Sequence, residues 1–73
     1  MKTTMSEVYT LSQKQINKVA RIISDYRARY IEIPSTEEIS KAIKEGKEAK
    51  VKVLQGDGQV IGEITLKQAY HIN

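Results

Sequence analysis

The chain has no cysteine, no tryptophan and no phenylalanine, and only one proline and one histidine among its 73 residues. Without cysteine it forms no disulfide, and a lone histidine does not supply the ligand set of a structural zinc site. No apolar run is long enough to span a bilayer, and the first seven residues lack the apolar core of a signal peptide. We therefore expect one small domain over 1–73, located in the cytoplasm, with no cofactor, metal or membrane partner.

The charge is modest and positive. Twelve Lys and Arg residues stand against nine Asp and Glu residues, which gives a net charge of +3. Charge of this size permits an anionic partner but does not require one. A domain this small buries only about 60% of the surface of its unfolded chain. Its stability must therefore come from strong local signals, a compact core or the formation of a homodimer.

The second half of the chain is typical of a β-hairpin. Two β-prone runs flank Asp57-Gly58, and they predict strands over about 50–55 and 59–66. A two-residue turn at this pair puts Lys52 opposite Glu63 and matches apolar residues across the strands. A three-residue loop over 56–58 mixes the two faces instead, so we favour the two-residue turn.

The favoured register has two consequences for the hairpin surface. Leu54 and Ile61 face each other on the side away from the helices. Gly62, in the middle of its strand, indicates a bulge or a close approach by another part of the backbone.

The first half of the chain is typical of helices. Apolar residues at spacings of three and four predict a helix over about 11–30, which begins at a Thr10–Gln13 capping box. A second capping box, Ser35 to Glu38, begins a helix over about 36–45 that Gly46 ends. Between these helices the alternating residues 30–33 favour a short third strand.

The expected class is therefore α+β, with two helices packed on a C-terminal antiparallel hairpin. Two segments stay open at this point. Residues 1–9 are either disordered or form an edge strand, and residues 67–73 either extend the last strand or turn into a helical cap.

The motifs that carry catalysis are missing. Gly56, Gly58 and Gly62 are spaced one residue too widely for a dinucleotide fingerprint, and they lie between two strands rather than between a strand and a helix. The only histidine, His71, lies near the end of the sequence and has no nucleophilic partner beside it. We expect a protein that is not an enzyme.

Basic residues form the candidate nucleic-acid-binding surface. One set lies on the outer face of the first helix, and the other runs from the second helix into the hairpin. The two sets are Lys14, Lys18, Arg21 and Arg29, and Lys41, Lys44, Lys47, Lys50 and Lys52. Such arrays are typical of binding to a phosphate backbone, either DNA or RNA. An ordinary solvated helix face explains the same pattern.

The order of helix, short strand, helix and hairpin resembles that of winged-helix DNA-binding domains. Residues 33–43 are similar to the step from a strand into the second helix of those domains. The sequence departs from that pattern between Gly46 and Val51, which leaves no room for the helix that reads the major groove. If DNA is bound, the first helix, the hairpin or a dimer must supply the reading surface.

The alternative function is a protein-interaction module: an inhibitor, an adaptor or an accessory factor of a mobile element. Apolar residues outside the main core pattern are its candidate contacts, namely Leu54, Ile61, Ile22 and Ile31. The same outer hairpin face is a candidate homodimer contact. The leading expectation is a small regulatory protein that binds nucleic acid.

Overall fold

The computed structural model describes residues 7–72. In chain order its elements are β1 (Glu7–Thr10), α1 (Gln13–Ile23), β2 (Ala28–Ile33), α2 (Thr36–Lys44), β3 (Lys50–Gln55), β4 (Val60–Thr65) and α3 (Leu66–His71). The expectations for residues 1–6 and 73 lie outside the described residues. Of the alternatives for the two ends, the structure has an edge strand in β1 and a helical cap in α3.

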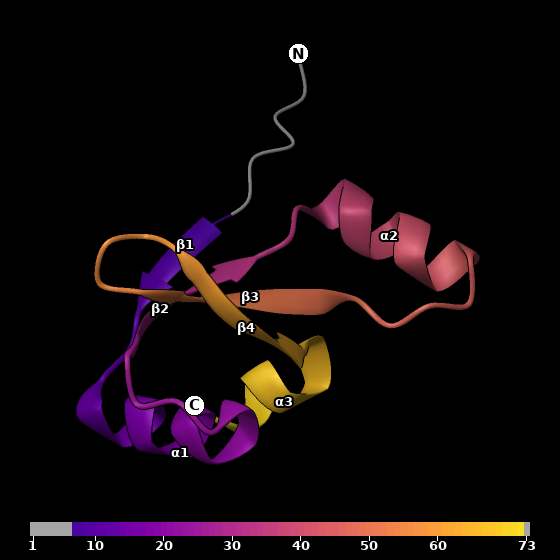
Figure 1. Ribbon diagram of the computed structural model, residues 1–73. Coiled ribbons are helices and arrows are strands. Elements are labelled where there is room, and N and C mark those ends of the chain that lie inside the picture. Colours follow the sequence, from indigo (N-terminus) through magenta and orange to yellow (C-terminus); the bar gives the residue numbers. More distant parts are fainter. Residues whose placement is uncertain (1–6, 73) are drawn as a thin grey trace.

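The strands form one antiparallel sheet in the order β1-β2-β3-β4. Helices α1 and α3 lie together on one face of this sheet, whereas α2 lies beside the end of the sheet (Figure 1). The α+β class is confirmed. The predicted layout of two helices on a hairpin is too simple, since the described chain has three helices and the hairpin is half of a four-stranded sheet.

The core lies between the sheet and the pair α1 and α3. Val19, Val51 and Val53 are fully buried there, and Ile64 is 1% exposed. Ala69 and Ile72 bring the end of the chain into the same cluster. The end of the sequence therefore completes the core, although it carries too weak a pattern for its structure to be predicted.

The predicted first helix over 11–30 is too long at its end and begins too early. In the structure, α1 begins after the N-cap residue Ser12. The Ser12 hydroxyl oxygen accepts a hydrogen bond from the Gln15 backbone N–H, and the Gln15 side chain accepts one from the Ser12 N–H. Helix α1 ends at Ile23, and Ser24 after it adopts the left-handed conformation with φ 59°. Residues 28–33 then form β2, which is longer than the expected strand over 30–33.

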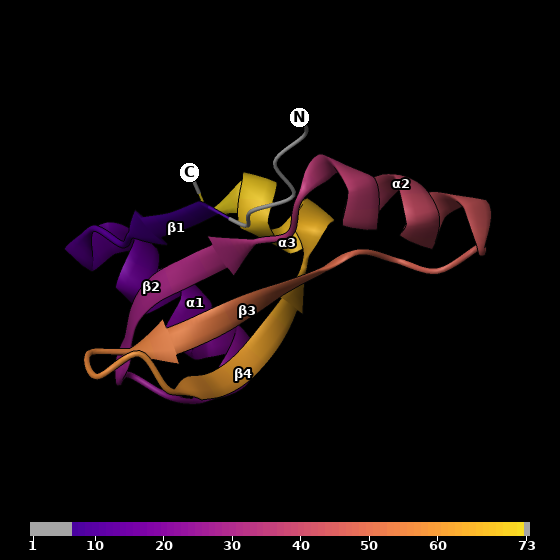
Figure 2. The same ribbon diagram turned by 90° about the horizontal axis from the view of Figure 1, so that it is seen from above.

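Helix α2 matches its predicted range closely. The Ser35 hydroxyl oxygen accepts a hydrogen bond from the Glu38 N–H, and Gly46, with φ 70°, follows the end of the helix. None of its residues is buried, and Ile43 is 70% exposed. Figure 2 shows α2 reaching beyond the strands that it connects.

The predicted register of the hairpin is correct for the half away from the turn and wrong at the turn itself. Lys52 pairs with Glu63, as predicted. At the turn, however, the Gln55 N–H donates to the Gln59 carbonyl over 2.9 Å, so the loop has three residues, Gly56-Asp57-Gly58. Gly58 takes φ 91° there, which a β-turn followed by a left-handed residue requires.

A bulge in β4 connects the two registers. Val53 pairs with Gly62, but the next residue, Leu54, pairs with Val60, so Ile61 is the extra residue on β4. The bulge expected from Gly62 is present one residue earlier, at Ile61, and the close neighbour of Gly62 is a side chain rather than the expected backbone. A Cβ atom added at Gly62 would lie 3.1 Å from Cγ2 of Ile23 on α1.

Candidate nucleic-acid interface

The outer face of α1 carries basic and amide side chains and no acidic one. The sequence of the helix, QKQINKVARII, contains three basic residues and no Asp or Glu. Ile16, Val19 and Ala20 face the core, and the residues opposite them are exposed. This exposed face, which we call the α1 face, consists of Gln13, Lys14, Asn17, Lys18 and Arg21.

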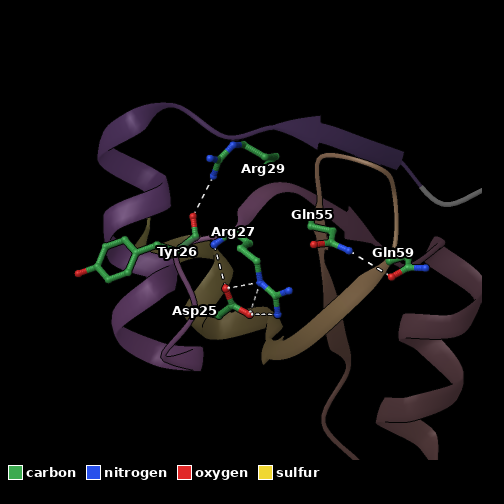
Figure 3. Close-up of polar contacts among 6 residues, drawn as sticks. All are labelled: Asp25, Tyr26, Arg27, Arg29, Gln55 and Gln59. Carbon is green, nitrogen blue, oxygen red and sulfur yellow. Dashed lines mark hydrogen bonds and ion pairs between the residues drawn. The ribbon is translucent and has the colours of Figure 1, made fainter.

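Because the helix ends at Ile23, Asp25 is absent from the α1 face. The longer helix predicted from the sequence would have placed this carboxylate at the end of the basic stripe. In the structure Asp25 binds Arg27 instead (Figure 3): the Arg27 Nη2 atom lies 2.8 Å from Asp25 Oδ2, and the Arg27 backbone N–H donates to Oδ1 over 2.9 Å. Between residues 7 and 72, ion pairs join Arg27 to Asp25 and Lys47 to Glu45, and neither pair involves α1.

The hydrogen bonds from Arg27 change the titration of Asp25. The guanidinium and the backbone N–H of Arg27 stabilise the carboxylate, so the pKa of Asp25 falls from 3.8 to about 2. This pair is a local brace of the turn between α1 and β2.

Arg29 belongs to β2, not to the first helix. Its Nη1 atom donates to the carbonyl oxygen of Tyr26 over 2.9 Å (Figure 3) and to that of Ala28 over 2.7 Å. This guanidinium therefore satisfies backbone acceptors at the irregular start of β2, where the register shifts between Ala28 and Tyr30. The structure separates Arg29 from the rest of the first basic set.

The second basic set is mixed with carboxylates. Lys41, Lys47, Lys50 and Lys52 line a shallow groove of about 390 Å³ between α2 and the sheet, together with Glu38, Glu45, Glu48 and Glu63. Four lysines and four glutamates therefore share the lining of this groove. They include Lys52 and Glu63, which are paired across β3 and β4. Lys44 is exposed on α2 outside it.

The two basic sets do not share one surface. Lys52 alternates along β3 with the buried Val51 and Val53, so its side chain lies on the opposite face of the sheet from α1. The two predicted basic sets therefore lie on separate surfaces, and a binding role for either set stays a prediction. Of the two, the α1 face has no acidic residue on its own helix.

The apolar candidates for protein contact are placed differently from expectation. Leu54 is only 7% exposed and pairs with Val60, so it does not face Ile61. Ile61 packs against the core at the bulge, and Ile31 belongs to the core. Of the four candidates, only Ile22 is exposed, at 39%.

A different apolar surface was missed. Tyr9 on β1 and Tyr70 on α3 are exposed and line a groove of about 300 Å³ whose floor includes Leu11, Ile31 and Leu66. Strand β1 pairs only with β2 among the described strands, so its other edge is open. In the sequence, only the β-prone residues 7–10 indicated that an edge strand forms here.

Two further features are absent from the described part of the chain. Residues 7–72 contain no group of three His, Asp or Glu side chains close enough to bind a metal ion. No helix in this part of the chain is long and apolar enough to cross a membrane.

Comparisons with known proteins add no assignment. No protein-family model matches the chain, and neither the curated proteins nor the solved structures contain a significant match to it. The comparisons therefore add nothing to the resemblance to winged-helix domains, which depends on the order of elements and on residues 33–43.

Proposed function

We propose that this chain is a small, non-enzymatic regulatory protein of the cytoplasm that binds nucleic acid through the α1 face. The observation that carries the proposal is the absence of any acidic residue from this helix. Phosphate groups attract Lys14, Lys18 and Arg21 with no carboxylate on the helix to oppose them. The groove beside α2 offers no comparable attraction, because four glutamates line it together with four lysines.

The physical basis of this binding is the release of counterions from the phosphate backbone. Three cations that neutralise three phosphates of a duplex give a slope of about −2.7 in a plot of log affinity against log salt concentration. The attraction is therefore moderate, and binding is expected at low salt with a steep loss as the salt concentration rises.

The test is a titration of labelled duplex DNA and duplex RNA with the protein at low and moderate salt. The double variant Lys18→Glu with Arg21→Glu, on the α1 face, is expected to abolish binding. The matched control, Lys41→Glu with Lys44→Glu on α2, makes the same change in net charge and is expected to retain binding. Equal losses in both variants would show that only net charge matters, and the absence of wild-type binding at low salt would refute the proposal.

A second candidate function is protein interaction through the open edge of β1, with a second copy of this chain as the partner. The observation that favours it is the exposure of apolar side chains along an unprotected edge: Val8 is 56% exposed and Tyr9 is 49% exposed. Edge strands usually carry charges, prolines or bulges that prevent pairing with another strand. Within β1, only Glu7 is charged.

A further inference from the structure

The α1 face consists of two parallel rows of different chemistry. Gln13, Asn17 and Arg21 recur every four residues in one row, and Lys14 and Lys18 form the adjacent row. Each step of four residues advances about 6 Å along the helix and turns by only about 40°, so the members of a row are neighbours on the surface. All five side chains are exposed.

The side chains of the first row are those that pair with base edges. Asparagine and glutamine amides form two hydrogen bonds with adenine in the major groove, and an arginine guanidinium forms two with guanine. Lysines, in contrast, act as point charges towards phosphate groups. We call Gln13, Asn17 and Arg21 the reading row, and Lys14 and Lys18 the backbone row.

The two amides of the reading row are hydrogen-bonded to each other. The Gln13 Nε2 atom donates to Asn17 Oδ1 over 3.1 Å. This bond leaves the Gln13 oxygen to accept and the Asn17 nitrogen to donate, which are the two functions that the edge of adenine complements. This bond restricts the rotamers of the two amides, so they lose less conformational entropy on contact than unpaired amides would.

The dimensions fit the major groove of B-form DNA. The reading row spans about 12 Å of helix, which corresponds to three or four base pairs. The major groove of B-DNA, about 12 Å wide, admits an α-helix, whereas the narrow major groove of A-form RNA does not. Helix α1 is the outermost layer on its face of the sheet (Figure 1), so no other described element covers the reading row.

We infer that α1 enters the major groove of double-stranded DNA, where the reading row contacts base edges and the backbone row contacts phosphates. This inference rests on the proposed function, since it names the class of nucleic acid that the same face binds. It replaces the missing third helix of the winged-helix order with the first helix of this chain.

The experiment begins with selection of duplexes from a random-sequence DNA library by the full chain at moderate salt. The selected duplex and a scrambled duplex are then titrated with the wild-type protein and two variants. Gln13→Ala with Asn17→Ala removes neutral groups only, and it is expected to lower the ratio of specific to non-specific affinity about tenfold or more while the salt slope stays unchanged. Lys14→Ala with Lys18→Ala is expected to weaken the binding of both duplexes equally. It should also reduce the slope of log affinity against log salt concentration by about 2.

Both variants keep the helix, because alanine has the highest helix propensity, and circular dichroism checks this. If the wild-type protein binds all DNA duplexes equally, or binds duplex RNA as tightly as DNA, the inference is overturned while the proposed function survives. If the amide variant keeps the full sequence preference, the reading row is refuted. If no duplex is bound even at low salt, the proposed function itself fails.

Discussion

Asp25 has a large effect on the surface of this protein because of where the helix before it ends. Its Oδ1 atom accepts the backbone N–H of Arg27, two residues ahead, and this local bond competes with the continuation of α1. Ser24 adopts a left-handed conformation immediately before it. The carboxylate is thereby paired with Arg27 in the loop, and the α1 face is left without a negative charge.

The pKa of Asp25 provides a test at the scale of single residues. Since the folded pKa of about 2 lies below the ordinary value of 3.8, the pair stabilises the fold above pH 3.8, and this stabilisation is lost as the pH falls through about 2. An NMR titration of the Asp25 carboxyl group is expected to show an inflection near 2. In Arg27→Ala the pKa should rise but stay below 3.8, because the backbone N–H of residue 27 still donates. An unchanged pKa in that variant would contradict the pairing, and Lys14→Ala serves as a control that leaves it unmoved.

Helices α1 and α2 differ in how closely they pack against the rest of the fold. Helix α1 and strand β4 are in direct contact at Gly62, where a Cβ atom would lie only 3.1 Å from Cγ2 of Ile23. Helix α2 has no buried residue and serves as a connection between β2 and β3. Its sequence pattern resembles that of α1, so the difference comes from the position of α2 beside the sheet rather than over it (Figure 2).

The contact between α1 and β4 leads to a stability prediction. Gly62→Ala places a Cβ atom 3.1 Å from Ile23 Cγ2, and this overpacking is expected to lower the free energy of unfolding by about 1 kcal/mol. The matched control is Gly56→Ala, where the nearest atom is Arg29 Cγ at 3.9 Å and little change is expected. Urea denaturation measures both variants. A stabilised Gly62→Ala protein would show that α1 moves away from β4 at no cost.

At the scale of the whole molecule, the two edges of the sheet are unequal. Strand β4 carries a bulge, and bulges discourage edge-to-edge pairing. The register of β1 against β2 is regular, and the apolar groove with Tyr9 and Tyr70 lies beside it. The β1 edge is therefore the better place for a second copy of the chain to pair.

This asymmetry predicts a concentration-dependent dimer. Sedimentation velocity over a range of concentrations is expected to show self-association that Val8→Lys, on β1, abolishes. The control is Val60→Lys on β4, because Val60 is 53% exposed and thus similar to Val8. A wild-type protein that stays monomeric at all concentrations, or equal effects of the two changes, would contradict self-association through β1.

Much of the fold follows from local patterns in the sequence. The ranges of α2 and of the hairpin strands, the stop at Gly46, the Lys52–Glu63 pair and the bulge near Gly62 were all predictable, because each depends on residues close together in the chain. The end of α1 was not, since the apolar spacing continues to Tyr30 although that residue belongs to a strand. The side-chain types of the α1 face were likewise visible in the sequence.

Only the tertiary structure decided which of those side chains form one surface. Pairing of β2 with β3 places Lys52 on the far side of the sheet from α1, and it separates Arg29 from the helix. The bulge in β4 brings Val60 opposite Leu54 and leaves Leu54 almost buried. The physical reason is that local composition determines where helices and strands form, whereas strand pairing and packing between distant segments determine which faces meet water. The sequence by itself determined an α+β chain whose first helix is basic, and the tertiary structure determined that Lys52 lies on the other face of the sheet from that helix.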